Sequence, residues 1–152
     1  MANVDKAFGL RPIGNLSGTG AQKQYGYEIA DNQAGAIYQG DLVVPVTGGN
    51  IERATANTST AVVGVFNGVF YSDPTTQKPT WKNYYPGGVA TNDITAFVVD
   101  DPDAVFLMDA DLSFVRADLF KNYSVTSATG VTQTGISSVQ LDSSVSGTAS
   151  TF

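Results

Sequence analysis

Short runs in which apolar and polar residues alternate, separated by turn residues, fill the middle of the chain. In QYGYEI, residues 24–29, the two tyrosines and the isoleucine fall on one face, as in a half-buried strand. The run LVVPV, residues 42–46, must end or lie at a sheet edge at Pro45, because proline has no N–H to donate. The sequence TGGN at 47–50 predicts a hairpin turn into a further strand at 51–55. This pattern predicts antiparallel strands.

The segment AVVGVFNGVFY, residues 61–71, carries the strongest strand signal. As one strand, it places Phe66 and Phe70 on one face with two glycines, and three valines and a tyrosine on the other. A tight hairpin turn at the central Asn-Gly pair is the alternative. We favour one strand because a better turn, SDPTTQKP, follows at 72–79. Aromatic residues then begin the expected return strand: Trp81, Tyr84 and Tyr85.

Two further apolar runs, 94–99 and 104–108, predict buried strands on either side of a turn that Pro102 enforces. Only residues 110–120 have some helical periodicity, with three apolar side chains near one face, and we expect at most a short helix there. Residues 23–121 are therefore expected to form a mainly β core domain, a single antiparallel β-sandwich or barrel-like fold.

Two flanking segments lack a core of their own. Residues 1–22 are interrupted by glycines, so they are either a frayed terminus or an extended arm that lies across a neighbouring subunit through Phe8, Leu10 and Ile13. Residues 122–152 are rich in Ser, Thr and Gly and carry one charged residue, which indicates a tail that is disordered or folded against partner chains. We also expect the natural chain, or a relative, to continue into another strand.

The composition argues against several classes of function. The 152 residues fit one principal domain, and the net charge of -6 argues against nucleic-acid or anionic-membrane partners, which attract basic surfaces. The chain has no run of about 18 apolar residues and its start lacks the pattern of a secretory signal, so we expect synthesis in a cytosol. Cys and His are both absent, which removes thiolate and imidazole chemistry. We therefore expect no cofactor and no catalysis.

Acidic residues are concentrated between positions 93 and 118, where seven aspartates accompany one arginine. Two pairs, Asp101/Asp103 and Asp109/Asp111, offer oxygen ligands of the kind that calcium prefers, but no EF-hand loop follows them. A solvated or salt-bridging acidic surface is the interpretation that we favour for residues 100–111.

Paired carboxylates near aromatic residues also suggest a glycosidase, with Trp81, Tyr84 and Tyr85 as a platform for a sugar. A catalytic acid needs a cleft that shifts its pKa, and short strands and turns do not indicate one. We interpret these aromatic residues as core and interface residues instead, because aromatic side chains pack well on sheets and anchor interfaces.

Short motifs are spread over residues 7–109. They are FGLRPIG at 8–14, YQGDLV at 38–43, VGVF at 63–66 with FY at 70–71, KP at 78–79 with YYPG at 84–87, and DDP at 100–102. Together they resemble small structural proteins of tailed bacteriophages, which are usually described as virion or head-decoration proteins. The tail lies outside the part that matches.

The resemblance implies a capsid cement protein, which binds the outer surface of the major capsid protein shell and stabilises it. Such subunits are commonly homotrimers at local three-fold positions, so the expected location is the virion exterior, after assembly in the bacterial cytoplasm. We expect the interface at the arm and the sheet aromatics: Phe8, Leu10, Arg11, Ile13, Phe66, Phe70, Trp81, Tyr84 and Tyr85. Two alternatives remain: a carbohydrate- or receptor-binding module of a phage tail or surface, and a carboxylate-based hydrolase.

Overall fold

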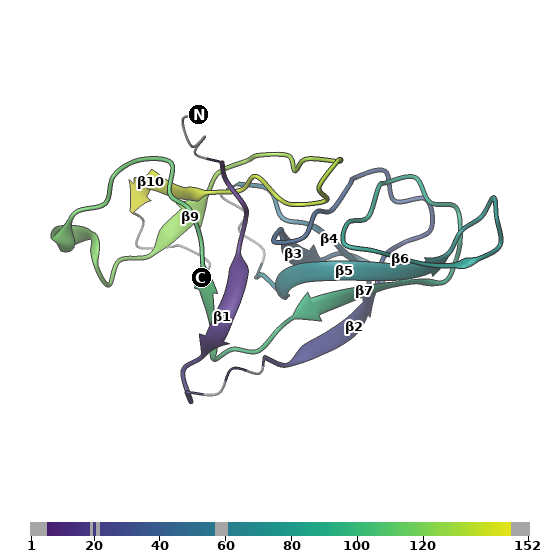
Figure 1. Ribbon diagram of the computed structural model, residues 1–152, viewed down its shortest axis with the longest axis horizontal. Coiled ribbons are helices and arrows are strands. Elements are labelled where there is room, and N and C mark those ends of the chain that lie inside the picture. The colour runs from purple at the N-terminus through teal and green to yellow at the C-terminus, as the bar shows by residue number, and fades with distance from the viewer. Residues whose placement is uncertain (1–5, 19, 21, 57–60, 147–152) are drawn as a thin grey trace.

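The computed structural model describes residues 6–18, 20, 22–56 and 61–146, and this part of the chain forms three antiparallel sheets (Figure 1). Its helical content is one 3-10 turn, η1 (Arg116–Asp118). This agrees with the expectation of at most a short helix. Within the same residues no helix has the length and apolar character to span a bilayer. The prediction of a mainly β, antiparallel domain is confirmed, although the sheets do not close into a barrel.

The main sheet has the strand order β2-β7-β5-β3-β4, with β6 paired to part of β5. The predicted hairpin turn joins β3 to β4, and β3 ends at Pro45 as expected, since proline cannot extend the ladder. The strands are β2 (Gln24–Glu28), β3 (Leu42–Pro45), β4 (Ile51–Arg53), β5 (Gly64–Ser72), β6 (Pro79–Lys82) and β7 (Ile94–Val99).

Strand β5 is the single long strand that the pattern predicts, but its two faces differ from simple alternation. A β-bulge between Phe66 and Gly68 shifts the register against β7, and the extra residue, Asn67, exchanges the faces of all later side chains. Phe66 therefore shares one core with Tyr71 and is fully buried, whereas Phe70 lies on the opposite face and is 39% exposed. The prediction of a common face for Phe66 and Phe70 is wrong, and so is the assignment of Phe66 to an interface.

Two apolar cores lie on opposite faces of the main sheet. The larger core packs Phe66 and Tyr71 of β5 against loop residues that include Ile37 and Tyr85. The smaller core surrounds Leu42 and Val65, and the flanking segments cover it with buried or partly buried side chains: Leu10, Phe106, Met108, Val125 and Val139.

The described part of the N-terminal arm lies on its own chain. Strand β1 (Arg11–Asn15) pairs with β8 (Ala104–Leu107), and the Asn15 side-chain amide donates a hydrogen bond of 2.7 Å to the carboxylate of Asp101. Ile13 falls at an irregularity in the β1–β8 register, where it remains 57% exposed. Strand β1 is therefore held along one edge by β8 of its own chain, and is not the free arm lying across a neighbour that the sequence suggested. Residues 1–5 lie outside the described residues.

The described part of the tail also pairs and packs within its own chain. Strands β9 (Tyr123–Val125) and β10 (Leu141–Ser146) pair with each other, while Val125 and Val139 fill the end of the smaller core. Between these strands, the buried Ser137 hydroxyl donates a hydrogen bond of 2.5 Å to the buried carboxylate of Asp41. The few apolar residues of the tail complete an existing core, which explains how so polar a segment can fold. Residues 147–152 lie outside the described residues.

Candidate protein-protein interface

An apolar loop, defined here as residues 112–120, joins β8 to β9 and contains η1. Figure 1 shows η1 at one end of the molecule, beyond β9 and β10. Its large apolar side chains are exposed to solvent: Leu112 67%, Phe114 37%, Val115 64%, Leu119 60% and Phe120 103%. Single exposed apolar residues are ordinary on a protein surface, but a contiguous group of this kind marks a contact site.

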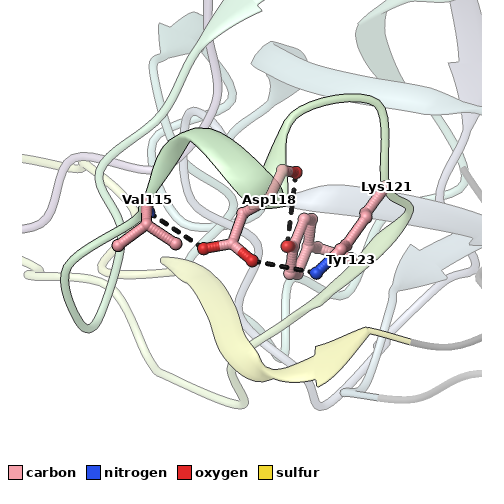
Figure 2. Close-up of polar contacts among 4 residues, drawn as sticks. All are labelled: Val115, Asp118, Lys121 and Tyr123. Carbon is pink, nitrogen blue, oxygen red and sulfur yellow. Dashed lines mark hydrogen bonds and ion pairs between the residues drawn. The ribbon is translucent and has the colours of Figure 1, made fainter.

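Polar contacts give the apolar loop a defined shape in the single chain (Figure 2). The Asp118 carboxylate accepts hydrogen bonds from the Val115 N–H at 2.9 Å and from the Lys121 ammonium at 3.0 Å. These two donors, the Val115 N–H first, hold the pKa of Asp118 below its usual range. Tyr123 donates to the Asp118 carbonyl at 3.4 Å and meets the Phe114 ring edge to face, with centroids 4.9 Å apart. The loop is therefore organised before any partner binds, which lowers the entropy cost of binding.

The sequence pattern did not identify the apolar loop as a surface. Its spacing of apolar residues suggests a helix face, yet the structure bends the segment around a 3-10 turn of three residues and exposes both sides of it. The available signal was the density of large apolar residues in LSFVRADLF, residues 112–120, in which only three positions are polar or charged.

A second exposed apolar surface, the aromatic patch, consists of Phe70 on β5 and Trp81 on β6. The two residues are direct cross-strand partners, and they are 39% and 59% exposed. The Trp81 ring lies over Gly68, where an added Cβ would come within 2.8 Å of the ring. The glycine thus leaves room for the indole to lie close to the sheet while one side of it remains open to a partner.

The two tyrosines that follow Trp81 do not extend the aromatic patch into a platform. Tyr84 stacks on Tyr38, with ring centroids 5.7 Å apart and planes 7° apart. Tyr85 is fully buried in the larger core, where its hydroxyl donates to the Gln33 carbonyl at 3.0 Å. The assignment of Tyr85 to an interface is wrong, because its ring completes the core and its hydroxyl is already bonded.

The predicted arm contacts are divided between the interior and the surface. Phe8 and Leu10 are partly buried, and Leu10 packs on the smaller core. The Arg11 guanidinium lies 5.0 Å from the centroid of the Phe8 ring, which is within cation-π range. Of the predicted interface residues, those that the structure leaves exposed are Arg11, Ile13, Phe70 and Trp81.

The acidic pairs serve as acceptors within turns and between segments. Asp101 accepts the Asp103 N–H at 3.1 Å, and this bond leads the contacts that lower the pKa of Asp101. Asp109 accepts the side-chain amide of Gln140 at 2.9 Å, and Asp111 accepts the Ser143 N–H at 2.9 Å. Among the described residues, no three acidic side chains come together as a metal site would require. Both pairs thus have a structural role: Asp101 stabilises a turn, and Asp109 and Asp111 bind residues of the tail.

No protein-family model, curated protein or solved structure matches the chain. The described features that bear on function are therefore the apolar loop, the aromatic patch, and the exposed arm residues Arg11 and Ile13. Each of these presents apolar or amphipathic side chains that suit contact with another protein.

Proposed function

We propose that this protein is a decoration (cement) subunit of a tailed-phage capsid, which acts by contact and not by catalysis. It binds the outer surface of the major capsid protein shell, associates with its own copies as a homotrimer, and stabilises the shell on the virion exterior. The motifs that resemble head-decoration proteins support the choice of partner. The observation that carries the proposal is that the apolar loop and the aromatic patch, two separate apolar surfaces, are both exposed in the described part of this small chain.

A subunit that holds a shell together in this way needs one surface for its own copies and another for the shell. The apolar loop and the aromatic patch meet that need, because η1 and β6 lie toward opposite ends of the long axis of the molecule (Figure 1). Trp81 and Phe70 are the residue types that anchor interfaces, where a buried aromatic side chain contributes much of the binding energy. We assign the aromatic patch, with Ile13 as an auxiliary contact, to the shell.

Re-binding to capsids that have been stripped of decoration tests the proposal. The purified protein should bind such capsids and raise their resistance to heat, and Trp81→Ala should weaken binding by about tenfold or more, as loss of a hot-spot residue does. Tyr25→Ala is the matched control, since Tyr25 is an aromatic residue of β2 that is 57% exposed outside the aromatic patch. Equal binding by Trp81→Ala and the wild type would contradict the assignment.

The exposed Trp81 also favours one alternative, a carbohydrate-binding module, because an accessible indole can stack on a sugar ring. A glycan pull-down separates the two functions. Specific retention that is lost in Trp81→Ala, without association with capsids, would replace the cement proposal by the carbohydrate-binding one.

A further inference from the structure

An apolar groove opens between the end of the main sheet and the strands β8 and β9. Its volume is about 650 Å³, within the range that holds a group of buried side chains or a ligand. Apolar side chains from six separate parts of the chain line it, among them Leu10, Val62, Val99, Phe106, Met108 and Val125. The smaller core is thus open on this side, where further apolar side chains could complete it.

Two carboxylates, those of Asp100 and Asp101, form an acidic rim on the apolar groove, which the Lys121 side chain also lines. Within the described residues, Oδ1 of Asp100 is buried without a hydrogen-bond partner. The other oxygen of Asp100 accepts the Tyr27 hydroxyl at 2.5 Å. The two carboxylates outnumber the Lys121 ammonium, so this side of the groove favours an occupant that carries a cation.

The apolar loop has the complementary chemistry. It presents exposed apolar side chains on both sides of Arg116, whose guanidinium has no hydrogen bond or ion pair among the described residues. The loop does not fill the groove of its own chain: its side chains stay exposed, although Lys121 and Tyr123, which follow it directly, line that groove.

From this match we infer that the apolar loop of one copy inserts into the apolar groove of a second copy, with Arg116 beside the acidic rim. Leu119 and Phe120 add apolar volume to the open smaller core, and the charges of opposite sign set the register. The contact joins two different surfaces, so a chain of such contacts either closes into a ring or continues as a filament. Closure after three copies would give the homotrimer. The inference rests on the self-association in the proposed function, and not on binding to the shell.

Two variants test the contact, because each should be unable to self-associate while the two should bind each other. The loop variant Leu119→Asp/Phe120→Asp keeps an intact groove, whereas the groove variant Met108→Glu keeps an intact loop. Sedimentation of the purified chains should show an oligomer for the wild type and monomers for each variant. An equimolar mixture should form a one-to-one heterodimer, because one intact loop then meets one intact groove. A wild-type monomer, an oligomer of the loop variant, or a mixture of folded variants that stays monomeric would overturn the inference.

Cysteine cross-linking keeps the test decisive if the groove variant does not fold. The chain contains no Cys, so the double variant Leu119→Cys/Val62→Cys carries a single pair of thiols. Under oxidation it should form covalent oligomers linked between chains, and the variant Leu119→Cys/Tyr25→Cys, with its second thiol outside the groove, should form far fewer. Linkage only within one chain would show that the loop fills its own groove, and no specific linkage would show that another partner occupies it. Both results contradict the inference.

Capsid binding by the same proteins separates this inference from the proposed function. A wild-type monomer that binds and protects capsids would defeat the inference alone. A loop-dependent oligomer that ignores capsids would defeat the proposed function alone.

Discussion

The contact between Ser137 and Asp41 permits a quantitative test of how the tail is held. In Ser137→Ala, the fully buried Asp41 carboxylate keeps the Tyr38 N–H at 2.8 Å but loses the hydroxyl donor at 2.5 Å. The Val139 N–H also loses its acceptor at 3.1 Å. Leaving a buried polar group without its partner costs about 1–3 kcal/mol, and more when the group is charged. We expect the free energy of unfolding to fall by roughly 2–3 kcal/mol at neutral pH, and the melting temperature by roughly 4–12 °C.

The size of this effect should depend on pH. Burial raises the pKa of Asp41 above its usual range, while the hydrogen bonds from Ser137 and Tyr38 oppose that rise. Between the unfolded and folded pKa values the folded chain binds more protons, so the stability that Asp41 contributes is lost as the pH rises through the folded pKa. Ser137→Ala removes a donor that favours the charged form. Its destabilising effect should therefore be largest at neutral pH and should shrink as Asp41 becomes protonated.

Urea unfolding followed by circular dichroism, at neutral pH and at a pH within the usual range of an aspartate pKa, measures both effects. The matched control is Ser138→Ala, because the Ser138 side chain makes no hydrogen bond with the described residues. An unchanged unfolding midpoint in Ser137→Ala would show that the tail is not held by Asp41. An equal loss at both pH values would refute the role of the charged carboxylate.

Two further stability predictions follow from the packing of β5 and β1. In Gly64→Ala, the new Cβ would overlap the Val99 carbonyl, so we expect a loss of about 1–3 kcal/mol in urea unfolding, whereas Gly14→Ala, with nothing within 4 Å, should lose much less. Asp101→Ala should lower the melting temperature because β1 loses its side-chain tie, and the difference from the wild type should vanish as the pH falls below the usual range of the Asp101 pKa. An equally large effect of Asp93→Ala, which changes an exposed aspartate, would contradict this role.

Local signals were enough to predict the strands of the main sheet. The turn at 47–50, the end of β3 at Pro45 and the long β5 all depend on neighbours in the sequence, and the structure has each of them. The bulge at Asn67 could not be predicted in this way. One inserted residue leaves the apolar composition of β5 unchanged and reverses its faces, so only the pairing with β7 reveals that Phe66 is core and Phe70 is surface.

The flanking segments were misjudged for a related reason. A segment with few apolar residues was expected to need a partner, yet Leu10 and Val139 each need only one place in a core that other segments have already formed. The apolar loop differs, because its spacing suggested one apolar helix face, whereas the structure bends it around η1 and leaves its apolar side chains exposed. Which side of each segment is covered depends on contacts between residues far apart in the sequence, such as Ser137 with Asp41.

We propose that the apolar loop and the aromatic patch are contact surfaces for other chains of a capsid. Electron cryomicroscopy of stripped capsids incubated with the protein tests it directly. The expected map has added density on the outer surface at three-fold positions, with β6 against the shell and the loop around η1 between neighbouring copies. Bare shells after incubation with folded protein, or bound subunits whose β6 and η1 both face solvent, would contradict the claim.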